Sequence, residues 1–188
     1  MGSMTRPASW TRVKLETLQR CRIFDLVRDW SRSPRDGEVY DFFRIEAGDW
    51  VNVIPLTPAG EVVMVAQYRH GAGKVMLEIP GGMVDPGEDP IVAAARELLE
   101  ETGYAAGRME PLGDINPNPA LFGNRVHFFV AHDVSWKQAI QNSGREETSV
   151  ELVARDALPE LVRSGEIDHA LIVSAFYRLD HHGEGETA

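Results

Sequence analysis

Residues 82–104 contain four glutamates, and the spacing of three of them, Glu97, Glu100 and Glu101, could assemble a cation site. An α-helix turns by about 100° per residue and would place these three side chains on one face. Glu97 and Glu101 are one helical turn apart, so their charges repel each other by roughly 0.2–0.5 kcal/mol. The alternative is that they form the solvated face of an amphipathic helix. A divalent cation would remove the repulsion, and oxygen ligands without a nearby cysteine or ligand-spaced histidine favour Mg²⁺ or Mn²⁺.

The same segment carries the signals for a well-delimited helix. Asp89 suits the N-cap, Pro90 suits the first helical position, and Gly103 suits the left-handed residue that ends a helix. Ala93 and Ala94 fall on the acidic face, so we expect no bulky side chain to cover the carboxylates. The periodicity predicts that the opposite, apolar side consists of Ile91, Val92, Ala95, Leu98 and Leu99.

The order of these residues resembles the Nudix box. Gly82 is followed after five residues by Glu88, after seven more by Arg96-Glu97-Leu98, and then by Glu100-Glu101 and Gly103-Tyr104, with no departure from the family pattern. Flanking segments resemble the ADP-ribose and nucleoside diphosphate sugar pyrophosphatase branch, namely Gln67-Tyr68-Arg69, Glu78-Ile79-Pro80-Gly81-Gly82 and Ser164-Gly165-Glu166-Ile167. The resemblance implies an α/β Nudix fold, an α/β/α sandwich around a mixed β-sheet. It also implies Mg²⁺-dependent hydrolysis of the pyrophosphate bond of a nucleoside diphosphate sugar, such as ADP-ribose or GDP-mannose.

The resemblance assigns roles to residues of the box. The residues that match metal ligands are Glu97, Glu100, Glu101 and the backbone carbonyl of Gly81. Arg96 matches the arginine that orients the box carboxylates, and Glu88 either holds the loop against that arginine or acts directly in catalysis. Gly82 and Gly103 are interpreted as positions where the backbone requires glycine, and Gly87 is a third candidate.

A second group of residues could contact the substrate. The planar guanidinium of Arg69 fits phosphate oxygens, although Arg69 could also be an ordinary surface arginine. Glu78 precedes the Pro-Gly-Gly turn and could bind metal, bind ribose or pair with Arg69. Phe24 is a candidate platform for the base, because relatives in the resembling branch often take base contacts from an N-terminal hairpin of the partner subunit.

The general base must come from outside the metal ligands, because those carboxylates are committed to the cation. In resembling pyrophosphatases it lies on a loop before a late strand, and Arg145-Glu146-Glu147 ends the long polar stretch that begins near Val134. If Thr148, Val150 and Leu152 form the inward side of that strand, the related pattern favours Glu146, with Glu147 as the alternative. Both could instead be solvated loop glutamates, in which case Glu78 or Glu100 would be the next candidate.

Hydrophobic patterning and turn signals predict mixed α and β structure, with strands first, then the central helix, more strands, and helices at the end. The expected strands are 21–30, 38–46, 50–56, 62–69, 75–79, 108–112, 125–131 and 148–153, and the later helices are 156–164 and 168–180. The first two strands would form an antiparallel hairpin around residues 33–37. We expect a cloning remnant and disordered start at 1–10, an N-terminal β extension at 11–48, the Nudix domain at 49–180 and a disordered tail at 181–188.

Composition limits the partners. The chain has 188 residues, of which 43% are hydrophobic, and a formal charge of −10, which argues against a broad nucleic-acid or anionic-membrane surface. It contains one cysteine, Cys21, and no apolar signal or spanning segment, so we expect a cytoplasmic protein without an internal disulfide. The N-terminal extension is too small to bury its large apolar side chains, which predicts a homodimer whose hairpin contributes to the partner's site. These side chains are Phe24, Val27, Trp30, Phe42 and Phe43.

Two other functions fit parts of the pattern. A nucleoside triphosphate sanitising enzyme of the same family would usually be shorter and lack the segment from Val13 to Ile45. A non-catalytic nucleotide-sugar sensor would usually have an eroded box, whereas the box is intact here. The residues therefore favour a diphosphate-sugar hydrolase, and they do not specify its base or sugar.

Overall fold

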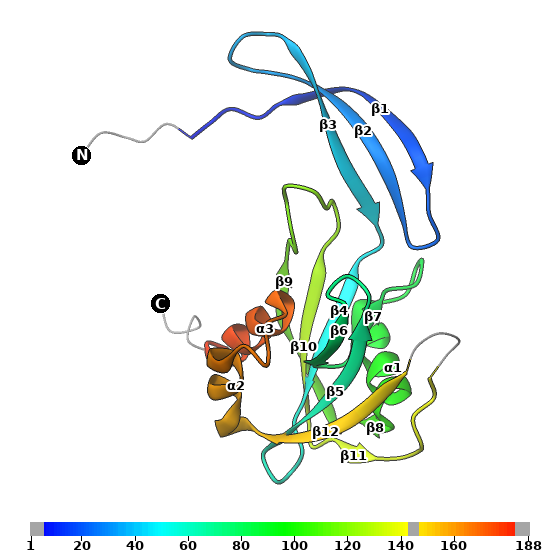
Figure 1. Cartoon of the computed structure of the whole chain (residues 1–188), viewed down its shortest axis with the longest axis vertical. Helices are drawn as coiled ribbons and strands as arrows, with labels where there is room; N and C mark the ends of the chain where they lie inside the picture. The colour runs from blue at the N-terminus through cyan, green and yellow to red at the C-terminus, as the bar shows by residue number, and fades with distance from the viewer. Residues whose placement is uncertain (1–5, 143–146, 183–188) are drawn as a thin grey trace, which may run out of the picture. The chain divides into compact units, whose positions relative to one another are not determined.

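The computed structural model describes residues 6–142 and 147–182, which form two compact units. The N-terminal unit comprises Met1–Gly48 with Asn116–Asn124, and the main unit comprises Asp49–Ile115 with Arg125–Ala188. Figure 1 shows the order of the elements along the chain.

The N-terminal unit is an antiparallel sheet of β1 (Thr11–Arg20), β2 (Phe24–Arg32) and β3 (Val39–Ala47), in that order. The predicted β2–β3 hairpin is confirmed, with Gly37 at φ 79° in its turn. The pattern did not predict β1 as a strand, and the pairing of β1 with β2 contains two register shifts. The segment Asn116–Asn124 joins this sheet where the amide of Ile45 donates to the carbonyl of Leu121 at 2.8 Å.

The main unit is built from a mixed set of strands. In the larger sheet, β4 (Trp50–Pro55) pairs with β10 (Val126–His132) in parallel, while β7 (Gly81–Met83) and β9 (Arg108–Ile115) pair antiparallel at the two edges. The second sheet has the order β12-β5-β6, with bounds Thr148–Ala154, Glu61–Arg69 and Lys74–Glu78. A short pair joins β8 (Tyr104–Ala105) to β11 (Ser135–Trp136). Each strand predicted for this unit is confirmed to within a few residues.

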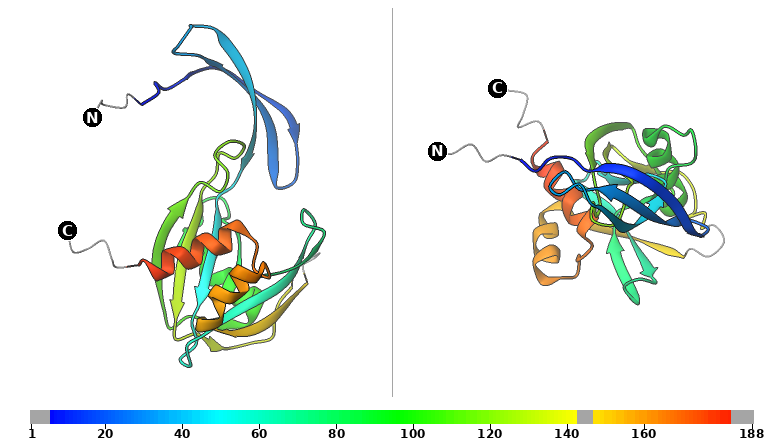
Figure 2. Two further views of the ribbon diagram at one scale, coloured as in Figure 1. Left: turned by 60° about the vertical axis from the view of Figure 1, so that its left-hand side comes forward. Right: turned by 90° about the horizontal axis from the view of Figure 1, so that it is seen from above.

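Helices cover both faces of these strands. Helix α1 (Pro90–Thr102) lies on one face, and α2 (Leu158–Ser164) and α3 (Ala170–Asp180) lie on the other (Figures 1 and 2). A short 3-10 turn, Arg155–Ala157, precedes α2. The α/β/α sandwich implied by the family resemblance is therefore confirmed. None of the helices in the described ranges is long and apolar enough to span a membrane.

The core consists of two apolar clusters, one on each face of the strands. Along β10, Val126, Phe128 and Val130 pack into the cluster beneath α2 and α3, while Phe129 and Ala131 pack into the cluster beneath α1. Strands covered on both faces are apolar at successive positions, which explains the nearly continuous apolar run in this segment.

Helix α1 faces the core with only part of the side that the periodicity predicted. Its N-cap Asp89 and its left-handed C-cap Gly103 are confirmed, but Val92, expected on the core side, is 55% exposed. Leu98 is fully buried as predicted, and Ala93 and Ala94, expected on the acidic face, are fully buried in the same cluster. Small side chains allow the helix backbone to lie close to the strands, and this turns the acidic face toward the sheet.

Candidate active site

Two glycines bring β7 close to both β4 and α1. Gly81 and Gly82 pair with Asn52 and Val51 of β4. A Cβ on Gly81 would lie 2.3 Å from the carbonyl oxygen of Val51, and a Cβ on Gly82 would lie 2.3 Å from Oε1 of Glu97. A side chain at Gly81 would collide with the backbone of the neighbouring strand, whereas a side chain at Gly82 would have to displace the carboxylate of Glu97.

Arg96 gathers three carboxylates around one guanidinium. Its Nη1 donates to Oε1 of Glu97 at 2.7 Å and lies 3.5 Å from Oε2 of Glu100, while Nε and Nη2 donate to the two oxygens of Glu88 at 3.0 and 2.9 Å. Nη2 also donates to the carbonyl of Met83 at 3.1 Å. The hydrogen bonds from Arg96 lower the pKa of Glu88, and those to Glu88 and Glu97 raise the pKa of Arg96 against the opposing effect of burial. This geometry supports the orienting role expected of Arg96 and a structural role for Glu88.

The carboxylate of Glu101 is held against the glycine turn. Glu101 is only 8% exposed, and its Oε2 accepts a hydrogen bond from the amide of Gly81 at 3.0 Å. The hydroxyl of Thr148 donates to the backbone carbonyl of Glu101 at 3.1 Å. A carboxylate is rarely buried without such donors, so β7 and the start of β12 both fix this end of α1.

The carboxylate oxygens held by Arg96 and by the Gly81 amide are ligands of the kind that fits a hard divalent cation. Glu101 and Glu97 place carboxylate oxygens beside Gly81 and Gly82, and Glu100 shares the guanidinium of Arg96 with Glu97. Within the described ranges, no group of three or more histidine, cysteine, aspartate or glutamate side chains is arranged so that it could hold a metal ion without further ligands. Mg²⁺ commonly takes one or two protein carboxylates and completes its octahedron with water and substrate phosphate oxygens.

Arg69 and Glu78 are joined in a bidentate pair at the ends of β5 and β6. Nε and Nη2 of Arg69 donate to Oε1 and Oε2 of Glu78 at 3.0 and 2.8 Å. Of the alternatives for Glu78, pairing with Arg69 is thus the one seen in the described contacts. Glu78 is fully buried, and Nδ1 of His169 lies 3.3 Å from its Oε2. Burial alone would raise the pKa of Glu78, but His169 and Arg69 outweigh it and lower that pKa to about 2.

His169 was not among the residues expected at the site. It lies 91 positions after Glu78, and no spacing in the sequence connects the two. The nearest signal was the segment Ser164-Gly165-Glu166-Ile167, which ends just before Asp168 and His169.

The loop before β12 is tied to the end of α1. The amide of Gln141 donates to the carbonyl of Glu100, and the amide of Lys137 donates to the carbonyl of Gly103, both at 2.8 Å. Glu147 is exposed and directly precedes Thr148, whose hydroxyl reaches Glu101. Glu146, the favoured candidate for the general base, lies outside the described residues. The strand pattern behind that choice is partly wrong, because Leu152, expected to face inward, is 48% exposed.

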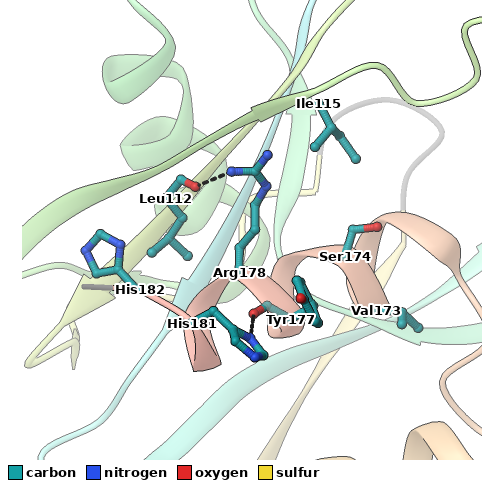
Figure 3. Close-up of a pocket in the computed structure, with 8 residues that line it drawn as sticks. All are labelled: Leu112, Ile115, Val173, Ser174, Tyr177, Arg178, His181 and His182. Carbon is teal, nitrogen blue, oxygen red and sulfur yellow. Dashed lines mark hydrogen bonds between the residues drawn. The ribbon is translucent and has the colours of Figure 1, made fainter. Parts of the chain in front are cut away.

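Phe24 belongs to the N-terminal unit, and a pocket on α3 of the main unit contains none of the predicted site residues. Phe24 is half-buried on β2 of the N-terminal unit and pairs in register with Ala47. A shallow pocket between α3 and β9 (Figure 3) is lined by other residues, among them Leu112, Tyr177 and Arg178, and by none of the predicted site residues. Its position beside α3 places it on the face of the sheet opposite α1.

The ends of the described chain make contacts that the sequence did not predict. Trp10, assigned to the disordered start, packs edge-on against Phe42 with ring centroids 5.4 Å apart. His182, assigned to the tail, lies with Nε2 3.2 Å from Oε1 of Glu110.

Comparisons with known proteins place these features in a family. The NUDIX domain family matches residues 48–176. A methanol dehydrogenase activator from Bacillus methanolicus is 35% identical over 129 residues, which cover 68% of this chain and 70% of that protein. An ADP-ribose pyrophosphatase from Bacillus subtilis strain 168 is 34% identical over 131 residues, which cover 69% of this chain and 70% of that protein. A crystal structure of an ADP compounds hydrolase shares the fold, with a TM-score of 0.83 at 22% identity over 96% of this chain and 98% of that one.

Proposed function

Because this chain belongs to the Nudix hydrolase family, we propose that it hydrolyses the pyrophosphate bond of a nucleoside diphosphate sugar in a Mg²⁺- or Mn²⁺-dependent reaction. The products would be a nucleoside monophosphate and a sugar phosphate. The observation that carries the proposal is the set of box carboxylates that Arg96 and the Gly81 amide hold beside the glycine turn. The name of the relative from Bacillus subtilis supports ADP-ribose as the first substrate to test.

The residues that would hold the cation are Glu97, Glu100, Glu101 and the carbonyl of Gly81. When bound, such cations neutralise diphosphate oxygens and lower the pKa of a coordinated water. Arg96 would keep Glu97 and Glu100 oriented, because a residue that hydrogen-bonds to metal ligands fixes their orientation. Arg69 would bind a diphosphate oxygen, because its fork-shaped guanidinium matches phosphate as well as it matches the carboxylate of Glu78.

The proton acceptor would come from the loop that precedes β12. The amide of Gln141 and the hydroxyl of Thr148 donate to the backbone carbonyls of Glu100 and Glu101, which supports a base from the segment between them. We expect that Glu146→Gln or Glu147→Gln, but not both equally, lowers kcat at least about a hundredfold with KM nearly unchanged. If both single variants and the double variant keep more than about a tenth of kcat, the base lies elsewhere.

A homodimer formed through the N-terminal unit is part of the proposal. Phe42 and Phe43 of β3 are 43% and 52% exposed, and Val13 and Leu15 of β1 are 52% and 45% exposed. Large apolar side chains gathered on one small sheet are typical of an interaction surface. A second copy would cover them and could place Phe24 at the partner's site.

The substrate is tested with a panel that separates the candidate functions. ADP-ribose, GDP-mannose, UDP-glucose, NADH, diadenosine polyphosphates and dGTP are incubated with Mg²⁺, and the products are identified by mass. Cleavage of a diphosphate sugar to monophosphate products supports the proposal, and loss of that activity in EDTA supports the cation. Preferred cleavage of dGTP would instead identify a triphosphate sanitising enzyme. Binding of a nucleotide sugar without cleavage of any compound would identify a sensor.

A further inference from the structure

The carboxylate of Glu78 depends on Arg69 for its hydrogen bonds. Glu78 is fully buried, and both of its oxygens accept from the guanidinium of Arg69. A buried acceptor that loses its donors pays the desolvation penalty of the group, and this penalty is larger for a charged group than for a neutral one. Arg69 can therefore turn its N–H groups toward another anion only if a second donor holds Glu78.

His169 stands where such a donor is needed. Its Nδ1 lies 3.3 Å from Oε2 of Glu78, and this nitrogen is buried and makes no aligned hydrogen bond within residues 6–142 and 147–182. The Arg69 contact and the His169 contact meet at the same carboxylate oxygen, Oε2. A small rotation of either side chain would complete a hydrogen bond from the imidazole.

The connection between α2 and α3 sets the position of His169. Helix α2 ends at Gly165, which has a φ of 81°, and Ile167 then inserts into the core with 1% exposure. Asp168 is paired with Nζ of Lys74, at the start of β6, at 2.7 Å. These contacts hold the residue before His169 on β6, the strand that ends in Glu78.

We propose that His169 is a positioning residue for the diphosphate. Its imidazole donates a hydrogen bond to the carboxylate of Glu78 when Arg69 turns part of its guanidinium to a diphosphate oxygen. The inference rests on the proposed function, in which Arg69 contacts the diphosphate. Arginine binds carboxylate and phosphate through the same parallel pair of N–H groups, so the two anions compete for Arg69. With His169 in place, the contact to substrate leaves Glu78 hydrogen-bonded.

The test compares two substitutions of similar size. Asparagine carries an amide N–H near the place of Nδ1, whereas leucine carries no donor. We expect His169→Leu to raise KM for ADP-ribose about tenfold, or 1.4 kcal/mol, with kcat changed less than about twofold, and His169→Asn to stay near the wild-type KM. His181→Leu, at the opposite end of α3, is the matched control and should leave both constants unchanged.

A second background separates positioning from a general structural effect. In Glu78→Gln the buried charge is absent, so His169→Leu should have little further effect on KM. In a double-mutant cycle, the effects of the two substitutions on KM should therefore not add. The Kd of α,β-methylene-ADP, measured by calorimetry, should follow the same order without any turnover. If the leucine variant does not fold, His169→Gln replaces it, because the longer side chain moves its amide away from the place of Nδ1.

The outcomes distinguish this role from the proposed function. If the wild-type chain hydrolyses ADP-ribose but His169→Leu leaves KM and Kd unchanged, the role of His169 is overturned and the proposed function stands. An equal rise in KM with asparagine, or the same rise in the Glu78→Gln background, also overturns it. A wild-type chain that cleaves no diphosphate sugar overturns the proposed function together with this inference.

Discussion

Replacing Gly82 with alanine is expected to disable turnover while leaving the fold intact. The new Cβ would lie 2.3 Å from Oε1 and 2.4 Å from Cδ of Glu97, whereas ordinary contact begins at about 3.4 Å. The carboxylate would therefore have to recede by about 1 Å from the place where Arg96 holds it. A displacement of about 1 Å in a positioned group can lower the rate about a hundredfold.

The stability of the Gly82→Ala variant should change little. The atoms in the way belong to the end of a flexible side chain, and Gly82 does not have a positive φ. Gly81→Ala provides the contrast, because its Cβ would meet the backbone carbonyl of Val51 at 2.3 Å, and backbone in a paired strand cannot recede. Overpacking of this kind typically destabilises by about 1–3 kcal/mol. Gly71→Ala is the neutral control, because its Cβ would have no atom within 4 Å.

The assay measures kcat for ADP-ribose with Mg²⁺, together with Tm for each variant. We expect Gly82→Ala to lose about a hundredfold in kcat with Tm close to wild type, Gly81→Ala to lose Tm, and Gly71→Ala to lose neither. The reasoning is refuted if Gly82→Ala keeps more than about a tenth of kcat, or if its activity falls only together with Tm.

Four further predictions follow from the same geometry. Glu97→Gln and Glu101→Gln should each lower kcat at least about a hundredfold with the fold preserved, and full activity in excess EDTA would contradict the cation assignment. Arg96→Lys should lower kcat about tenfold to a hundredfold, since lysine cannot bridge several carboxylates; an unchanged rate would contradict the orienting role. Glu78, whose pKa falls from 4.5 to about 2, contributes stability that is complete above pH 4.5 and is lost as the pH falls through 2. Urea denaturation between these pH values should show a loss of about 3 kcal/mol that Glu78→Gln lacks. Phe43→Glu, opposite Arg28 in the sheet, should give a monomer by light scattering, and an unchanged dimer would place the interface elsewhere.

Much of the main unit was predictable because its signals are local. The N-cap at Asp89 and the left-handed Gly103 fix the ends of α1, and neither depends on distant residues. The strands of the main unit were also found, because alternating or continuous apolar runs and turn residues reflect the nearest neighbours along the chain. The spacing of the box glutamates within one helix predicted that they share one side of it.

What the sequence determined by itself is therefore most of the elements of the main unit and the one acidic helix that carries the box. Only the tertiary structure decided how far the buried face of that helix extends, because Ala93 and Ala94 pack on the sheet beside Leu98 while Val92 is exposed. It also decided that His169 meets Glu78, since the α2–α3 connection must first fold onto β6. Both outcomes depend on contacts between residues far apart in the chain, and periodicity within one segment carries no information about them.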